Sequence, residues 1–235
     1  MLEINLKGKK IDYTIRKSKQ AKNLRISVKG NGKVVLSMPW YVPKMAGKQF
    51  LQTHEDWILK QLQGRAEKKK VFVSETKLGF LGQAFYELKF FEGKGKRSFL
   101  REHFRELHFF QGSVCTDLQA EIRLHLETFY REKARRYLKN RVQIFAEKLE
   151  VSINKIFIKN QQTRWGSCSG KGNLNFNWRI IFAPKEIVDY LVIHEVCHLQ
   201  EMNHSVSFWE LVELLDPKFK QHKKWLRKEG KQLDF

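Results

Sequence analysis

The eleven residues HEVCHLQEMNH, at positions 194–204, bring three histidines and a glutamate into one short stretch. An α-helix has 3.6 residues per turn, so His194 and His198, four positions apart, lie on one face and can bind one ion together. Glu195 lies about 100° round the helix from His194, where it can address a metal-bound water without becoming a ligand. This HExxH pattern predicts a metal site with an adjacent general base.

The third histidine tests that prediction, because six further residues of unbroken helix would carry His204 to nearly the opposite face from His198. Asn203 can end the helix, since asparagine enters the left-handed region more readily than most residues. Ser207 and Glu210 have the spacing of a capping box, so a second helix is expected to begin at SFWELVELL. We therefore expect His204 to lie in a turn between two helices.

Three neutral imidazoles around Zn²⁺ leave a fourth position for water, whose pKa the ion lowers toward about 7. Glu195 could then accept the proton of that water, and hydrolysis is the expected reaction. Two alternatives stay open. Glu210 or Glu213 could replace His204 as the third ligand, or the histidines could simply satisfy local hydrogen bonds on an ordinary helix.

The chain of 235 residues is long enough to bury a hydrophobic core, as one large domain or two small ones. Its hydrophobic content of 42% is typical of a globular protein and argues against a disordered one. No uninterrupted apolar run approaches membrane-spanning length, so we expect no membrane partner. Three cysteines are too few for a disulfide framework, and we therefore expect a cytoplasmic protein.

The net charge of +20 is unusual and is concentrated at the front of the chain. Residues 1–110 contain 24 lysines and arginines against 10 acidic residues, whereas the remainder contains 21 against 15. Such a field attracts polyanions, so nucleic acid is a candidate partner. A basic surface that aids solubility explains the same charge.

Alternating apolar residues predict strands in the first part of the chain, at KKIDYTIRKS, NLRISVKG and KVVLSMPWYV. Gly30-Asn31-Gly32 between the last two predicts a hairpin turn, because glycine and asparagine accept a positive φ. Residues 43–70 have helical spacing, and the aromatic-rich residues 77–110 favour short strands. We therefore predict a β-rich amino-terminal domain over residues 1–110.

A long helix is predicted from Asp117 to about Glu150, followed by two strands, INKIFIKN and NLNFNWRIIF. Pro184 then opens the helix that carries the HExxH pattern, because proline is tolerated in a first helical turn. No internal repeat is detected. The expected fold class is α+β, with a second domain over residues 111–235.

The loop QQTRWGSCSGKG between the two strands does not fit a phosphate-binding loop, because its glycine spacing is wrong and no Ser or Thr follows its lysine. It is either a tight connection or the edge of a site. Arg164 is its candidate substrate-binding residue, since a guanidinium can hold a carboxylate, a phosphate or a developing oxyanion. Cys168 is expected to be an inert thiol rather than a nucleophile.

Three blocks, TRWGSCS, NLNFNWRIIFAP and HEVCHLQEMNHSVSFWELV, resemble the signature blocks of the YgjP-like metal-dependent hydrolases, which are relatives of zinc metallopeptidases. The resemblance extends more loosely to RKSKQAKNLRISVKGNGKVVLSMP near the amino terminus. It implies a zincin-like carboxy-terminal domain in which His194, His198 and His204 bind zinc and Glu195 is the catalytic base. Metzincins share this histidine spacing but have glycine where this chain has Glu201.

These observations favour a zinc-dependent hydrolase, and in particular a metallopeptidase in which the strand NLNFNWRIIF pairs with an extended peptide or protein substrate. The first alternative is a metal-dependent nucleoside triphosphate pyrophosphatase, an activity that the resemblance also implies, with Arg164, Lys171 or Arg179 receiving the phosphate charge. The second alternative is a nucleic-acid-binding module with structural zinc. Structural zinc usually takes four protein ligands, often cysteines, and no cysteines stand at suitable spacing here.

Overall fold

The computed structural model describes residues 2–29, 32–66, 71–161 and 163–234. The chain forms two compact units, Met1–Val71 and Phe72–Phe235. The boundary therefore lies before the strands of residues 77–110, whereas the sequence placed it after residue 110. The reason is that those strands share a hydrophobic core with the carboxy-terminal helices.

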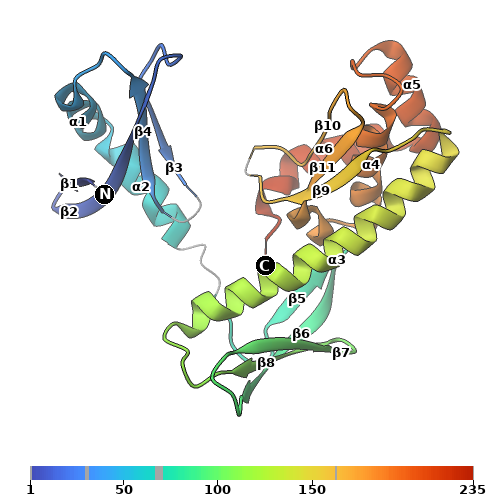
Figure 1. Ribbon diagram of the computed structural model, residues 1–235, viewed down its shortest axis with the longest axis horizontal. Helices are drawn as coiled ribbons and strands as arrows, with labels where there is room; N and C mark the ends of the chain where they lie inside the picture. The colour runs from blue at the N-terminus through green and yellow to red at the C-terminus, as the bar shows by residue number, and fades with distance from the viewer. Residues whose placement is uncertain (1, 30–31, 67–70, 162, 235) are drawn as a thin grey trace. The chain divides into compact units, whose positions relative to one another are not determined.

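The first unit consists of a four-stranded sheet and two helices, drawn in blue and cyan in Figure 1. The strand order is β1-β2-β4-β3, with β2 and β4 parallel and the outer pairs antiparallel. The elements are β1 (Leu2–Leu6), β2 (Lys9–Ser18), β3 (Arg25–Val28), β4 (Val34–Pro39), α1 (Lys44–Thr53) and α2 (Glu55–Ala66).

The antiparallel pairing of β3 with β4 confirms the predicted hairpin, although Gly30 and Asn31 lie outside the described residues. The helical stretch predicted over residues 43–70 is two helices, because α1 ends at Thr53 and His54 caps it. Gly47 is needed where α1 meets the sheet, since a Cβ there would lie 2.8 Å from Leu36 Cδ2.

The second unit begins with another four-stranded sheet, of order β5-β6-β8-β7, with β6 and β8 parallel. The predicted strands in residues 77–110 are thus confirmed as β5 (Lys77–Phe80), β6 (Gln83–Glu92), β7 (Phe99–His103) and β8 (Glu106–Gln111). The two sheets have the same strand order and the same orientations. Each begins with a hairpin whose turn ends in a glycine at positive φ, 80° at Gly8 and 77° at Gly82. The structure therefore reveals a repeat of topology that the sequence did not disclose.

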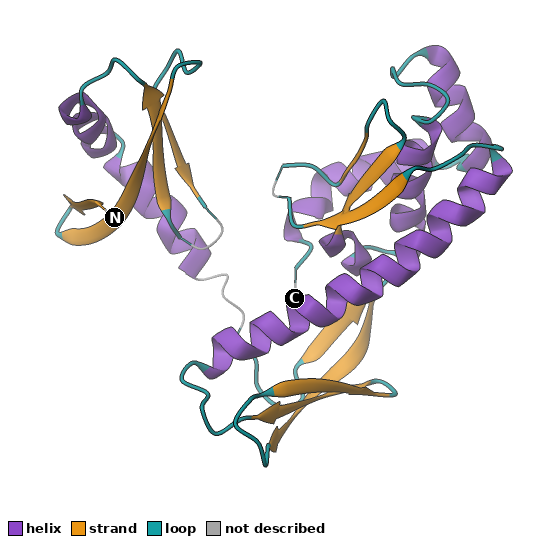
Figure 2. Cartoon of the chain, viewed as in Figure 1, coloured by secondary structure: helices purple, strands orange, loops and turns teal. Residues whose placement is uncertain are grey.

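The long helix α3 (Leu118–Lys148) organises the second unit, as Figures 1 and 2 show. Its amino terminus is capped by Asp117, whose side chain accepts a hydrogen bond from the N–H of Ala120 at 3.0 Å. One face of α3 is buried, and it packs against β7, the helix α4 (Lys185–Cys197) and the 3-10 helix η1 (Trp178–Phe182). The predicted helix at residues 117–150 is confirmed.

The sheet β5–β8 also contacts the carboxy-terminal elements directly. The N–H of Leu81 donates to the carbonyl of Ile181 at 2.8 Å, and a Cβ at Gly82 would lie 2.8 Å from Pro184 Cα. The β5–β6 turn therefore lies against the start of α4, which explains why this sheet belongs to the second unit.

A three-stranded sheet precedes α4, with order β10-β11-β9. Its strands are β9 (Lys155–Lys159), β10 (Gly166–Cys168) and β11 (Asn173–Asn177). The predicted strand NLNFNWRIIF was wrong in its second half, because the chain turns into η1 after Asn177. The Asn177 side chain accepts from the N–H of Arg179 and so caps η1. Strand β10 was missed, because its three residues lie in a glycine-containing loop.

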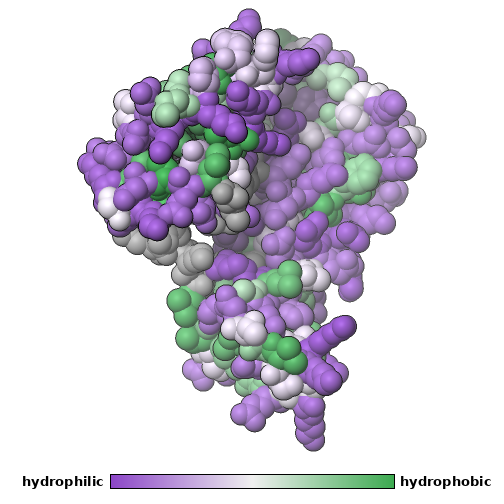
Figure 3. Space-filling model, turned by 60° about the vertical axis from the view of Figure 1, so that its left-hand side comes forward, coloured by the Kyte–Doolittle hydropathy of each residue, from purple (hydrophilic) through white to green (hydrophobic). Residues whose placement is uncertain are grey.

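Two further helices complete the unit, α5 (Val206–Leu215) and α6 (Phe219–Glu229), before the short 3-10 helix η2 (Gly230–Gln232). The new helix expected at SFWELVELL is confirmed, but its cap is Ser205 rather than Ser207. Within the residues described, no helix combines the length and the apolar character needed to cross a membrane. Hydrophilic residues cover most of the face drawn in Figure 3, between separate hydrophobic patches.

Candidate metal centre

His194, His198 and His204 form a group whose ligand atoms lie within 4.8 Å of one another. His194 lies in the last turn of α4, and His198 is the residue that caps this helix. His204 lies in the connection between α4 and α5, as the sequence predicted. Glu210 and Glu213, the alternative third ligands, are exposed on α5 and are not members of this group.

The spacing of the ring nitrogens matches that of ligands around one ion. His194 Nε2 and His204 Nε2 are 3.1 Å apart. Two nitrogens that each lie about 2.0–2.1 Å from a tetrahedral zinc ion are roughly 3.3 Å apart. His198 Nδ1 lies 3.0 Å from the carbonyl oxygen of Glu201. That contact favours a proton on Nδ1 and leaves Nε2 of His198 to face the other two rings.

The connection after α4 differs from the one predicted. Asn203 does not take a positive φ, and α4 has already ended at Cys197. The N–H groups of Gln200 and Glu201 both donate to the carbonyl of Cys197, at 3.1 and 2.9 Å. These short-range bonds satisfy the end of the helix without a left-handed residue. The chain can therefore reverse within a few residues and bring His204 back to His194.

Aromatic residues of α5 hold the three imidazoles in place. The ring of His198 stacks on Phe208, with centroids 4.5 Å apart, and the ring of His204 stacks on Trp209 at 5.6 Å. Phe208 is fully buried. The apolar periodicity of this segment of the sequence gave no sign that Phe208 and Trp209 contact the predicted ligands.

Glu195 lies beside the triad with only 4% of its surface exposed. Gly166 of β10 lies directly against it, because a Cβ at Gly166 would lie 2.8 Å from Glu195 Cδ and would collide with its carboxylate oxygen. A hydrogen bond from the backbone N–H of Cys168 also reaches the Glu195 carboxylate. Strand β10 therefore holds the predicted general base in position, a role that the sequence did not reveal.

Burial raises the pKa of Glu195 to about 8, although the nearby Arg164 and the hydrogen bond from Cys168 act in the opposite direction. Burial also lowers the pKa of His194 to about 3, and the neighbouring His198 and His204 lower it further. The pKa of His204 is lowered as well, chiefly by burial. At neutral pH His194 and His204 are therefore neutral, which is the form that binds a metal.

Two buried polar atoms of the centre have no hydrogen-bond partner among the described residues, His194 Nδ1 and Glu195 Oε2. Buried polar atoms are normally paired with protein groups, water or ions. The unpaired Glu195 Oε2 lies beside the three converging imidazoles and is consistent with a group that binds there, whereas His194 Nδ1 is the ring nitrogen that does not face His204. The donor set, three neutral imidazoles beside a carboxylate, fits a zinc ion with an open position.

Four other residues near the HExxH segment or in the preceding loop differ in their relation to this centre. Arg164 is exposed and close enough to Glu195 to act on its pKa. Asp189 faces away, because its carboxylate accepts two hydrogen bonds from Arg141 of α3, at 2.6 and 2.9 Å. Cys168 and Cys197 are free thiols, and burial raises the pKa of both. Neither is therefore an activated nucleophile.

The prediction that the strand in NLNFNWRIIF pairs with a substrate is wrong for β11, which is the part of that segment that forms a strand. Strand β11 is the centre of its sheet, with β10 and β9 bonded to its two edges, so it has no edge to offer. The edge strand on the side of Glu195 is β10.

The solved structures that match the chain include two metallopeptidase zymogens. The crystal structure of the metallopeptidase zymogen abylysin from Pyrococcus abyssi is 22% identical, with a TM-score of 0.36, over 39% of this chain and 93% of that one. The metallopeptidase zymogen jannalysin from Methanocaldococcus jannaschii is 20% identical, with a TM-score of 0.35, over 39% and 95%. No curated protein matches the chain. The family described as YgjP-like, metallopeptidase domain, matches residues 22–229. The chain therefore belongs to the YgjP-like metallopeptidase-domain family.

Proposed function

We propose that this protein is a zinc-dependent metallopeptidase in which His194, His198 and His204 bind zinc and Glu195 is the general base. The observation that carries the proposal is the convergence of three imidazoles within 4.8 Å, beside a buried carboxylate. Membership of a family described by a metallopeptidase domain supports the same reaction class.

A zinc ion at this place would supply Lewis-acid chemistry, which acidifies water and polarises a carbonyl. The carboxylate of Glu195 accepts the proton of the attacking water and later delivers it to the leaving amine. The positive charge of Arg164 favours the ionised form of Glu195, whereas burial favours the neutral form and raises its pKa. The N–H of Cys168 and the bare Cα of Gly166 hold that carboxylate where the proton must move.

An extended peptide fits the edge of β10. In an antiparallel pair the backbone groups of successive residues point to opposite sides. The carbonyl of Trp165 and the N–H of Ser169 bond to β11, so Gly166 and Cys168 direct their backbone groups away from it. Because the N–H of Cys168 already reaches Glu195, we propose that a peptide pairs with the other edge groups, the N–H and carbonyl of Gly166 and the carbonyl of Cys168, which places its backbone next to Glu195. Arg164, exposed two residues before β10 begins, then serves to bind a carboxylate or a developing oxyanion.

Peptides and nucleoside triphosphates are the two substrate classes to be separated. Of the cationic residues considered for phosphate, Arg179 already contacts Asp234 at 3.3 Å and the side chain of Asn160. Its guanidinium also lies 4.4 Å from the Trp178 ring centroid. These contacts disfavour Arg179 as a phosphate ligand and weigh toward peptides.

The test is an assay of zinc-loaded protein with an unfolded protein, a set of short peptides and the four nucleoside triphosphates. We expect cleavage of peptide bonds, detected by mass spectrometry, and no release of pyrophosphate. Pyrophosphate release without peptide cleavage would replace the peptidase by a nucleotide hydrolase. A chelator-treated sample is the control for metal dependence.

Binding of nucleic acid is a second proposed property, favoured by the charge of the first unit. Met1–Val71 contains 17 lysines and arginines against 5 acidic residues. Trp40 and Tyr41, with 59% and 65% of their surfaces exposed, follow β4. The ammonium of Lys17 donates to the carbonyl of Trp40 at 3.0 Å. Exposed aromatic rings among cations are the features by which proteins bind single-stranded nucleic acid.

Fluorescence anisotropy of a labelled single-stranded oligonucleotide with the full chain tests this property. We expect binding that weakens steeply with salt, because cations on the protein displace counterions from phosphates. Trp40→Ala should weaken binding by roughly 1–3 kcal/mol if one base stacks on it. Absence of binding at low salt would eliminate the proposal. Trp57→Ala, on α2, is the matched control.

A further inference from the structure

The β7–β8 hairpin carries a second group of metal-ligating side chains, His103, Glu106 and His108. His103 and Glu106 are cross-strand partners, and His108 follows Glu106 by two residues on β8. Side chains alternate between the two faces of a strand, and cross-strand partners share a face. The three side chains therefore project from the same face, with their ligand atoms within 4.8 Å of one another.

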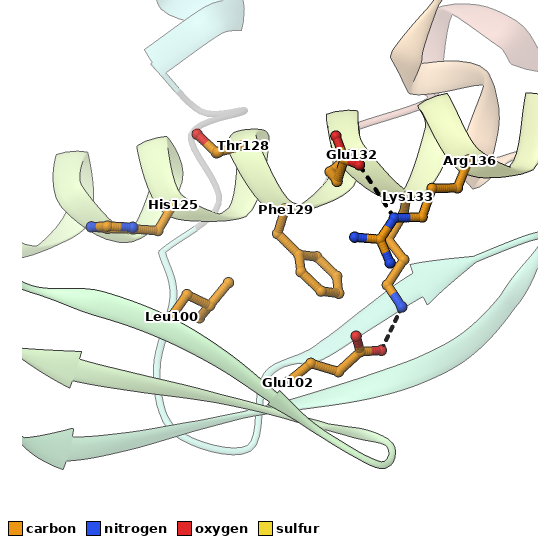
Figure 4. Close-up of a pocket in the computed structure, with 8 residues that line it drawn as sticks. All are labelled: Leu100, Glu102, His125, Thr128, Phe129, Glu132, Lys133 and Arg136. Atoms are coloured by element: carbon orange, nitrogen blue, oxygen red, sulfur yellow. Dashed lines mark hydrogen bonds and ion pairs between the residues drawn. The ribbon is translucent and has the colours of Figure 1, made fainter.

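The opposite face of β7 packs toward α3. Figure 4 shows Leu100 and Glu102 pointing toward Phe129 and Lys133, and these residues line a pocket of about 300 Å³. The ammonium of Lys133 donates to Glu102 at 2.7 Å. This packing fixes which face of β7 is inward. It leaves His103 on the other face, where it is exposed.

Two of the three side chains are in hydrogen-bond contact, and the third packs beside them. His108 Nε2 lies 2.6 Å from Glu106 Oε2, as in an ordinary surface ion pair. The ring of His103 also lies beside His108, with centroids 5.5 Å apart and planes tilted by 32°. Two imidazoles and a carboxylate form a complete set of ligands for one ion, with positions left for water.

Two cations lie next to this group, and Lys89 is close enough to Glu106 to help lower the pKa of that carboxyl group. Lys89, the neighbour of His108 on β6, forms an ion pair with Glu87. Arg101, the cross-strand partner of His108, has its guanidinium 6.0 Å from the centroid of Phe99. The carboxylate of Glu87 partly offsets the charge of Lys89, whereas the ring contact leaves the charge of Arg101 in place.

The connection between the two strands is conformationally unfavourable. Phe104 takes a φ of 53° with 85% of its surface exposed, although bulky residues rarely adopt the left-handed region. An ion that joins His103 to Glu106 would link the residues on either side of this turn and stabilise it.

We propose that His103, Glu106 and His108 form a second, solvent-facing site for a divalent transition-metal ion. Imidazole ligands suit zinc, copper and nickel, whereas calcium and magnesium prefer sites made only of oxygen. The site is independent of the proposed peptidase reaction. Its exposure predicts weaker binding than at His194, His198 and His204, because its ligands are less constrained by packing.

Isothermal titration of the metal-free full chain with Zn²⁺ tests the proposal. We expect His103→Gln to bind one ion fewer than the wild type and to retain its hydrolytic activity. Because His103 is exposed, this change should leave the circular dichroism spectrum unaltered. His125→Gln is the matched control, since His125 lies on α3 on the other side of the hairpin and should leave the number of ions unchanged.

A second variant separates the two sites. His204→Ala should keep the ion of the hairpin, and addition of His103→Gln to it should abolish that remaining binding. The proposal is overturned if His103→Gln binds as many zinc ions as the wild type, whatever the behaviour of His204→Ala.

Discussion

Glu195→Gln is expected to abolish hydrolysis while the protein keeps its zinc. The amide has nearly the same shape as the carboxyl group but cannot accept a proton, and a general base contributes roughly 10²–10⁴-fold to a rate. Burial raises the pKa of Glu195 to about 8, so the metal-free protein already holds a largely neutral side chain there at pH 7. The substitution should therefore leave folding almost unchanged. The measurements are kcat/KM on a cleaved peptide and zinc content by mass spectrometry.

A matched control makes the Glu195→Gln result specific. Glu201→Gln changes a glutamate in the same connection whose backbone carbonyl, rather than its side chain, contacts His198. It should leave the rate close to that of the wild type. Unchanged hydrolysis in Glu195→Gln would exclude Glu195 as the general base, and loss of zinc in that variant would make it a ligand instead.

His204→Ala should remove zinc from the centre and with it the activity. His204 is exposed and lies outside any helix, so the truncation should not disturb the core. Even groups that only orient metal ligands contribute 10–100-fold to affinity, so we expect loss of a ligand to weaken zinc binding by more than about 100-fold. A ligand that binds only the folded state stabilises it, by about 2.7 kcal/mol at a concentration 100 times Kd. The thermal shift produced by zinc should therefore shrink in His204→Ala.

The matched control for His204→Ala is His54→Ala, which removes an exposed histidine from the first unit. It should retain both the activity and the zinc-dependent thermal shift. Full zinc affinity in His204→Ala would show that His204 is not a ligand, and the same experiment on Glu210→Gln and Glu213→Gln would then test the two alternative ligands.

The sequence alone predicted the elements that depend on local patterns. Helix α3 and the helix that begins after Pro184 follow from apolar periodicity and from residues that start helices well. The spacing of His194 and His198 placed both on one side of α4, because the helix repeat is set by backbone geometry. It also placed His204 in a turn, since continued helix would have separated it from the other two. These inferences involve residues within one or two turns of each other.

Errors arose where distant segments decide the outcome. The boundary after residue 110 separated β5–β8 from α3, although their apolar faces form one core. No local pattern tells which later helix will cover a sheet. Likewise, WRIIF has the composition of a strand, but Asn177 caps a 3-10 helix there and the side chains become buried against α3. Burial in the folded chain overrode the β propensity of the segment.

What the sequence predicted by itself was the proposed chemistry of the centre, because imidazoles at helical spacing and an adjacent carboxylate are properties of a single segment. The tertiary structure alone decided how that chemistry is held. It brought Gly166 and the N–H of Cys168 against Glu195, and it stacked Phe208 on His198. Such contacts join segments that are remote along the chain, and the packing of a shared core, rather than local backbone preference, selects them.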